Sequence, residues 1–124
     1  MKEALFYRCG ACGNIVFASR EAALSCCCAP MERLRDNSVK CDVSRHLPDA
    51  RMEDGLLKVT VGIELHPSEP DHYIEWVYAE TVTGGVFRFF GPGEEPRCAF
   101  PDGTKVRNVY AYCTRHGLWK CMKT

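Results

Sequence analysis

The first 36 residues carry two cysteine groups that limit how this segment can fold. Cys9 and Cys12 form a Cys-x-x-Cys pair next to glycines, and a run of three cysteines follows at 26–28. About 35 residues bury too little apolar surface to fold without a staple. Thiolates from two separate turns can surround one ion tetrahedrally, as expected for zinc or for iron in a sulfur-only site. A bound metal is therefore expected to supply much of this segment's stability.

The nine cysteines also bear on the cellular compartment. The start of the chain lacks the apolar core and cleavage site of a signal peptide, so a cytoplasmic location is expected. Cytoplasmic cysteine-rich proteins hold metals more often than disulfides, which disfavours a secreted disulfide framework. A structural zinc knuckle remains an alternative for Cys9 and Cys12. A thioredoxin-like redox pair is disfavoured because no βαβ pattern surrounds them.

Charge and hydropathy exclude two classes of partner. Sixteen basic and sixteen acidic residues give a formal net charge of zero, which does not favour a phosphate-binding surface, so nucleic acid is not expected as a partner. No apolar run approaches the roughly 20 residues that span a bilayer, so no membrane partner is expected either.

Alternating apolar residues predict an all-β protein. Short alternating segments flank Cys9 and Cys12, and beyond the charged segment 31–37 the predicted strands are Leu57–Leu65, Tyr73–Val82, Val86–Phe90 and Val106–Tyr112. Thr83-Gly84-Gly85 is predicted to be the turn of a hairpin. With no credible helix, this spacing predicts an antiparallel β-sandwich of immunoglobulin-like type. The domains are expected to be residues 1–36 and 37–124.

All four histidines of the chain lie beside turn residues, and one of them belongs to a Cys-x-x-His pair. A single histidine on the surface of a β-protein is usually a solvated polar residue. The combination here indicates a metal site gathered from distant segments, with the candidate ligands His46, His66, His72, Cys113 and His116. Five ligands exceed what tetrahedral zinc accepts, and a mixed nitrogen–sulfur set suits iron or copper. An octahedral ion would keep one position open for a small molecule.

These motifs resemble the desulfoferrodoxin family over nearly the whole chain and in the same order. The cysteines at 9, 12, 26 and 27, followed by Pro30-Met31, resemble its desulforedoxin-type domain. The block His72-Tyr73-Ile74-Glu75-Trp76 is the most specific part of the resemblance to its superoxide reductase domain. The resemblance to the superoxide reductase domain also includes His46-x-Pro48, His66-Pro67 and Cys113-x-x-His116-Gly117-x-Trp119.

The resemblance implies a superoxide reductase with two iron ions per chain. The first iron would bind the thiolates of Cys9, Cys12, Cys26 and Cys27. Cys28 stands where the family has glycine, and a shifted register that uses Cys27 and Cys28 is the minority alternative. This desulforedoxin-like domain would cover residues 1–36.

The second, catalytic iron would bind the imidazoles of His46, His66, His72 and His116, with Cys113 as the axial thiolate. It would reduce superoxide to hydrogen peroxide by one electron without evolving oxygen, a detoxification under oxidative stress. The resemblance also implies a homodimer and a rubredoxin-like electron donor. A non-catalytic iron electron-transfer protein and a zinc-stabilised β-sandwich binding module are the alternatives. The complete set of five predicted ligands favours the reductase, because neither alternative needs an open mixed-ligand site.

Two residues before the first histidine depart from the family, which typically has glutamate followed by lysine. This chain has Ser44 and Arg45. Arginine keeps the charge that attracts superoxide but does not deprotonate in proteins, so Arg45 is expected to steer the anion and order the water that delivers protons. The alternative for Arg45 is a solvated surface charge. Ser44 offers no carboxylate to the open position of oxidised iron, which should bind water, hydroxide or an added anion more readily. The alternative is that Asp42 or Asp49, which lie close in sequence, substitutes for the glutamate.

Overall fold

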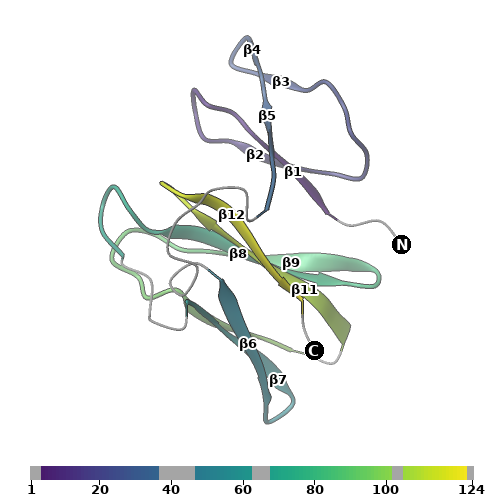
Figure 1. Ribbon diagram of the computed structural model, residues 1–124, viewed down its shortest axis with the longest axis vertical. Coiled ribbons are helices and arrows are strands. Elements are labelled where there is room, and N and C mark those ends of the chain that lie inside the picture. The colour runs from purple at the N-terminus through teal and green to yellow at the C-terminus, as the bar shows by residue number, and fades with distance from the viewer. Residues whose placement is uncertain (1–3, 37–46, 63–67, 102–104, 123–124) are drawn as a thin grey trace. The chain divides into compact units, whose positions relative to one another are not determined.

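The computed structural model describes residues 4–36, 47–62, 68–101 and 105–122 (Figure 1). Within these ranges the elements are β-strands and no α-helix occurs, which confirms the all-β prediction. No helix among them has the length and apolar character that a membrane crossing requires. The chain divides into two compact units, Met1–Arg35 and Asp36–Thr124.

The first unit is a three-stranded antiparallel sheet with a short hairpin. β1 (Leu5–Arg8) pairs with β2 (Ile15–Ala18) on one side and with β5 (Glu32–Leu34) on the other. The hairpin consists of β3 (Ser25–Cys26) and β4 (Ala29–Pro30). The short strands β1 and β2 were predicted from alternation. β5 was not, because its charged residues carry no alternating apolar pattern.

Among the described residues of the first unit, the large apolar side chains that are buried are Phe6 and Tyr7. Phe6 and Phe17 lie opposite each other in the β1–β2 register and pack edge to face, with ring centroids 6.1 Å apart. The hydroxyl oxygen of Tyr7 accepts a hydrogen bond from the Ala22 backbone N–H at 3.0 Å, which ties down the loop after β2. So small an apolar cluster is consistent with a unit that depends on a metal for stability.

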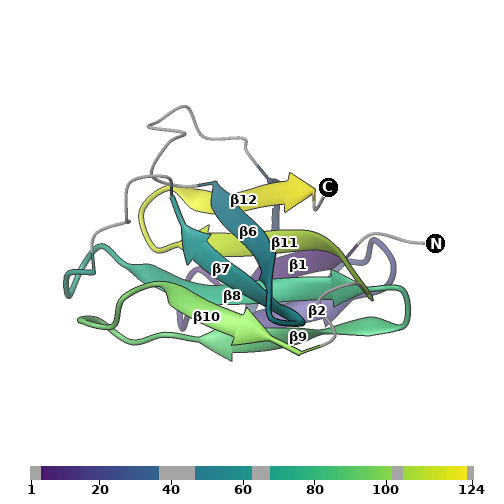
Figure 2. The same ribbon diagram turned by 90° about the horizontal axis from the view of Figure 1, so that it is seen from below.

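The second unit is a sandwich of two antiparallel sheets, which Figure 2 shows as two layers. In the three-stranded sheet the order is β10-β7-β6, and in the four-stranded sheet it is β12-β11-β8-β9. The strands are β6 (Pro48–Glu53), β7 (Leu56–Val61), β8 (Ile74–Thr81), β9 (Gly84–Phe89), β10 (Arg97–Phe100), β11 (Val106–Cys113) and β12 (Gly117–Met122). The predicted antiparallel β-sandwich is confirmed.

The core of the sandwich lies between its sheets and follows the two-residue period of the strands. Leu57, Val59 and Val61 project from β7 and are almost wholly buried. They belong to one apolar cluster with residues of the facing sheet, among them Val77, Ala79, Val109, Ala111 and Cys113. The strict alternation of β7 thus marks its buried face, and β11 contributes the Cys113 thiol to the same core.

The hairpin turns differ in part from the prediction. Asp54-Gly55, with φ of +53° and +78°, joins β6 to β7 as the left-handed two-residue turn that this dipeptide favours. The hairpin predicted at Thr83-Gly84-Gly85 is confirmed, but its turn lies earlier, because Thr81 pairs with Gly84 and the turn residues are Val82 and Thr83. Gly84 and Gly85 begin β9.

Gly85 pairs with Glu80 in the strand, and the ring of Tyr78 fills the space that a side chain at position 85 would need. A Cβ at position 85 would overlap the hydroxyl of Tyr78 and lie 2.7 Å from the carbonyl oxygen of Ala79. Aromatic side chains that cover a strand glycine are a known means of holding a hairpin in register.

We therefore expect Gly85→Ala to destabilise the sandwich. Overpacking typically costs about 1–3 kcal/mol, and a loss of about this size should appear in the free energy of unfolding. Tryptophan fluorescence in a denaturant titration reports this unit alone, because both tryptophans of the chain lie in it. Gly91→Ala is the matched control, since its Cβ meets only a Glu94 carboxylate oxygen at 3.6 Å. Equal free energies of unfolding for the two variants would contradict the close packing of Tyr78 against Gly85.

Candidate metal centres

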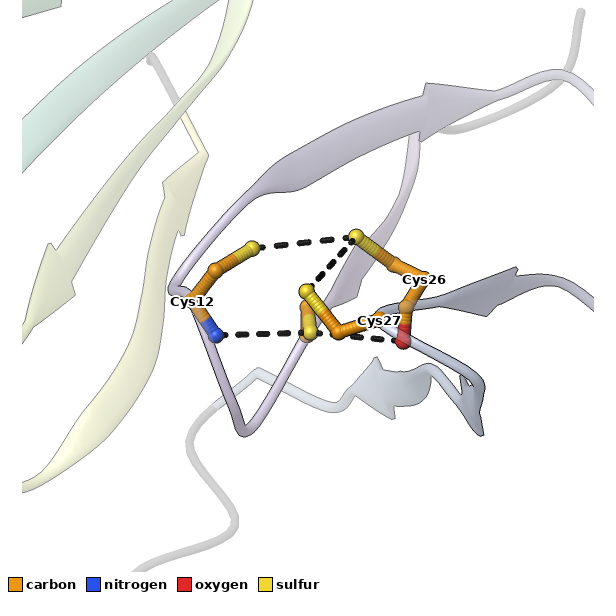
Figure 3. A group of neighbouring side chains, drawn as sticks. Cys12, Cys26 and Cys27 are labelled. Atoms are coloured by element: carbon orange, nitrogen blue, oxygen red, sulfur yellow. Dashed lines mark hydrogen bonds between the residues drawn. The ribbon is translucent and has the colours of Figure 1, made fainter.

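Four thiols meet in the first unit, and Figure 3 shows three of them, Cys12, Cys26 and Cys27, facing one another. Cys9 and Cys12 belong to the turn after β1, and the other two to the β3–β4 hairpin. The four sulfur atoms all lie within 4.8 Å of one another. Cys26 Sγ is 3.7 Å from Cys12 Sγ and 3.9 Å from Cys27 Sγ. Sulfurs bound at about 2.3 Å to a tetrahedral ion are about 3.8 Å apart, so the group has the size of such a site.

Backbone hydrogen bonds shape the first turn and direct N–H groups at its sulfurs. Gly13, at φ +79°, donates its N–H to the Cys9 carbonyl at 2.9 Å. The N–H of Cys12 points at Cys9 Sγ (3.5 Å), and that of Asn14 at Cys12 Sγ (3.4 Å). The Asn14 side-chain amide also donates to Cys26 Sγ at 3.9 Å. Sequence analysis missed Asn14, because its contact with the second cysteine group forms only in the folded unit.

The electrostatics of the four thiols call for a cation among them. The backbone N–H of Cys12 is the main cause that lowers the pKa of Cys9 to about 7. The side chain of Cys12 is the main cause that raises the pKa of Cys27 to about 12, and it raises the pKa of Cys26 as well. Thiols this close cannot all ionise unless a positive charge compensates them. The donor set therefore fits a metal ion, whose binding displaces the remaining protons.

Cys27 and Cys28 form the β3–β4 turn, and only Cys27 belongs to the four-sulfur group. Cys26 pairs with Ala29, so these two cysteines are the turn residues, and both have positive φ, +52° and +59°. Two consecutive left-handed residues are the geometry of a type I′ turn. The structure groups Cys27, and not Cys28, with the other three sulfurs.

A second group of ligand atoms, from His72, Cys113 and His116, lies in the sandwich unit, again within 4.8 Å of one another. Cys113 Sγ is 3.8 Å from His116 Nδ1. The two imidazole rings pack edge to face with centroids 5.0 Å apart. The structure thus brings together three of the five predicted ligands. His46 and His66, together with Arg45, lie outside the described residues.

A β-bulge lies opposite the cysteine of this second group. Tyr112 pairs with Trp76, but the next residue, Cys113, pairs with Ile74, so Glu75 is an extra residue in β8. Bulges re-aim side chains and are frequent beside functional sites. Here Cys113, at the end of β11, is fully buried in the apolar cluster that includes Ile74.

Short turns hold the two histidines. The N–H and carbonyl of His72 exchange hydrogen bonds with the carbonyl and N–H of Glu69, at 3.1 and 2.9 Å. The carbonyl of His116 accepts a hydrogen bond from the Trp119 indole N–H at 3.2 Å. Gly117, at φ +81°, follows the turn that carries His116 and begins β12. Each histidine backbone is thus fixed by partners a few residues away.

Burial is the main cause that raises the pKa of Cys113, whereas backbone N–H groups of Arg115 and His116 and the Arg115 charge oppose it. A thiolate here therefore needs a compensating cation. Imidazole and thiolate together are ligands for transition metals such as iron, copper and zinc. The three donors fit a metal ion, and they lie where two strand ends meet.

We expect Cys12→Ser to remove about one metal ion per chain, with the second centre still loaded. Serine is a poor ligand for the metals that thiolates bind, and elemental analysis of the purified protein measures the loss. Cys28→Ser is the matched control, because Cys28 lies outside the four-sulfur group, and it should retain both metals. Loss of the metal from Cys28→Ser but not from Cys26→Ser would show that the ligand register is shifted by one residue.

Known proteins share this sequence pattern. The Desulfoferrodoxin family model matches residues 40–122. The desulfoferrodoxin of Syntrophotalea carbinolica is 38% identical over 118 residues, covering 91% of each chain. That of Nitratidesulfovibrio vulgaris is 37% identical over 118 residues, covering 92% of each chain.

Solved structures share the fold. The superoxide reductase of Treponema pallidum matches 97% of this chain and 99% of its own, with a TM-score of 0.83 at 24% identity. The superoxide reductase of Giardia intestinalis matches 64% of this chain and 97% of its own, with a TM-score of 0.51 at 26% identity. The family model spans more than half of the sequence, and the curated relatives exceed 30% identity over about nine-tenths of it. The chain therefore belongs to the desulfoferrodoxin family.

Proposed function

We propose that this protein is a superoxide reductase, which converts superoxide to hydrogen peroxide with one electron and two protons and releases no dioxygen. The observation that carries the proposal is the grouping of two imidazoles and one buried thiol, from His72, His116 and Cys113, at one end of the sandwich. Membership of the desulfoferrodoxin family supports it, as does the likeness to the Giardia intestinalis superoxide reductase.

In this proposal the catalytic iron is held by the imidazoles of His46, His66, His72 and His116 and by the thiolate of Cys113. Iron in this ligand set supplies the electron that reduces superoxide. A second iron is held by Cys9, Cys12, Cys26 and Cys27. We assign the first site to a desulforedoxin-like domain of residues 1–36 and the second to the sandwich of residues 37–124. The division of the chain into the units Met1–Arg35 and Asp36–Thr124 supports that boundary.

The chain's own groups prepare the catalytic site in three ways. Burial of Cys113 in the apolar cluster keeps water away from the sulfur, and the N–H groups of Arg115 and His116 stabilise its thiolate form. The fixed backbones of His72 and His116 hold their rings in place. Arg45 attracts the superoxide anion and orders the water that delivers protons, because a guanidinium does not itself give up a proton.

The proposal extends to partners and location. A rubredoxin-like carrier re-reduces the protein, the assembly is a homodimer, and the compartment is the cytoplasm. These parts rest on the resemblance to the family and on the cysteine content. Light scattering of the purified protein measures the assembly, and a monomer at all concentrations would contradict it. Anaerobic mixing with a reduced rubredoxin tests the donor, and no electron transfer would contradict that assignment.

Metal analysis followed by a superoxide pulse tests the activity. We expect about two iron ions per chain in anaerobically purified protein. The reduced protein should consume superoxide with one hydrogen peroxide formed per superoxide and no oxygen released. Cys113→Ser should lose most of this activity, because a neutral hydroxyl cannot replace the thiolate as a ligand. Cys98→Ser, which changes a half-buried cysteine outside both groups of metal-ligand atoms, should retain the activity.

The other results of this experiment contradict the reductase. Iron at both sites without superoxide consumption would favour an electron-transfer protein. Zinc throughout protein expressed with ample iron, with no redox activity after iron loading, would favour a zinc-stabilised binding module.

Arg45→Ala should lower the second-order rate constant with superoxide at low ionic strength. Electrostatic steering by a whole protein raises association rates about 10- to 1000-fold, and we expect this single charge to account for about threefold. The difference should shrink at high salt, where the Debye length is about 3 Å. Arg45→Lys keeps the charge and is the matched control. Stopped-flow absorbance measures both, and an unchanged rate for Arg45→Ala at low salt would assign Arg45 to the solvated surface.

A further inference from the structure

We propose that Thr114 is a positioning residue that holds His72 in register with Cys113 and His116. Thr114 follows Cys113 directly and begins the turn that ends in His116. His72 comes from a different segment, the turn before β8. Some contact must therefore set the position of one segment relative to the other. This inference rests on the metal centre of the proposed function and not on its superoxide chemistry.

Thr114 bonds to both sequence neighbours of His72. Its hydroxyl oxygen accepts a hydrogen bond from the Tyr73 N–H at 3.2 Å. The hydroxyl proton is donated to the Asp71 carbonyl, a longer contact at 3.5 Å. The backbone N–H of Thr114 also donates to the Tyr73 carbonyl at 3.1 Å. One residue thus brackets His72 from both sides.

These hydrogen bonds of Thr114 lie just beyond the regular ladder between β8 and β11. The last ladder pair is Cys113 with Ile74, immediately after the bulge at Glu75. Past that pair, the ladder no longer defines where residue 72 lies relative to β11, so the threonine contacts take over this role. The β-branched side chain suits it, because threonine has restricted rotation about χ1. Partners that orient metal ligands typically change metal affinity or activity about 10- to 100-fold when they are removed.

The same chain offers a matched hydroxyl far from the centre in sequence and at the opposite end of β8. Thr81 Oγ1 accepts a hydrogen bond from the Thr83 N–H at 3.4 Å and donates to the Gly84 carbonyl at 3.2 Å. It therefore makes the same two kinds of bond in the β8–β9 turn. A loss of fold stability alone should follow from either substitution, whereas a change at the metal centre should follow only at Thr114.

The test measures metal release from full-length protein loaded with Co²⁺ as the probe. Loaded protein is mixed with excess chelator, and the decay of thiolate-to-cobalt absorption is followed. The phase that belongs to the histidine–cysteine centre is the one missing from Cys113→Ser. We expect Thr114→Val to accelerate this phase about tenfold. Thr114→Ser, which keeps the hydroxyl, and Thr81→Val should release cobalt at the wild-type rate. The four-cysteine phase is the internal control and should not change.

Three outcomes would overturn the inference. They are an unchanged rate for Thr114→Val in the histidine–cysteine phase, an equal acceleration of that phase by Thr81→Val, and an acceleration by Thr114→Ser as large as that by Thr114→Val. Wild-type protein with no cobalt at this centre would remove the proposed function as well. If wild-type protein holds metal there but does not consume superoxide, only the proposed activity fails, and the release rates still decide the role of Thr114.

Discussion

Thiolates that are crowded together or buried in apolar surroundings need a cation beside them, and both units of this chain are built around that need. In the first unit, sulfur–sulfur distances of 3.7 and 3.9 Å leave no room for unscreened charge. In the second, the core itself encloses Cys113. Metal binding and folding are therefore linked in each unit, but they are linked differently. The first unit buries few large apolar side chains, whereas the second has a full sandwich core.

The sandwich core and the second centre depend on each other through β8 and β11. Their pairing forms the middle of the four-stranded sheet, and it ends at the bulge in β8 opposite Cys113. The ligands sit where regular pairing stops, so the rigid sheet supplies their approximate position and individual hydrogen bonds supply the remainder. The bonds of Glu69, Thr114 and Trp119 are of this second kind. This division of labour is typical of sites built on rigid elements.

Sequence reasoning succeeded where a local pattern has a single physical meaning. Alternation identified β7, because one of its faces is core and the other is exposed. It did not identify β6, although the Asp54-Gly55 turn between β6 and β7 is a hairpin signal visible in the sequence. The cysteines and histidines could be named as candidate ligands from residue type and spacing. The roles of Asn14 and Thr114 could not, because each depends on a contact with a segment distant in sequence.

The left-handed turn at Cys27 and Cys28 has a consequence for how the first site is loaded. Left-handed backbone costs about 1–2 kcal/mol for each residue that carries a Cβ, and neither turn residue is glycine. Without metal, much of the population should relax to other turn conformations, in which the four sulfurs are not assembled. The ion then meets a site that is preorganised only part of the time, and its apparent affinity falls by the unassembled fraction. Glycine at position 28 would remove about half of that conformational penalty. A cysteine at position 28, in place of glycine, therefore lowers the apparent affinity of the four-cysteine site for its metal ion.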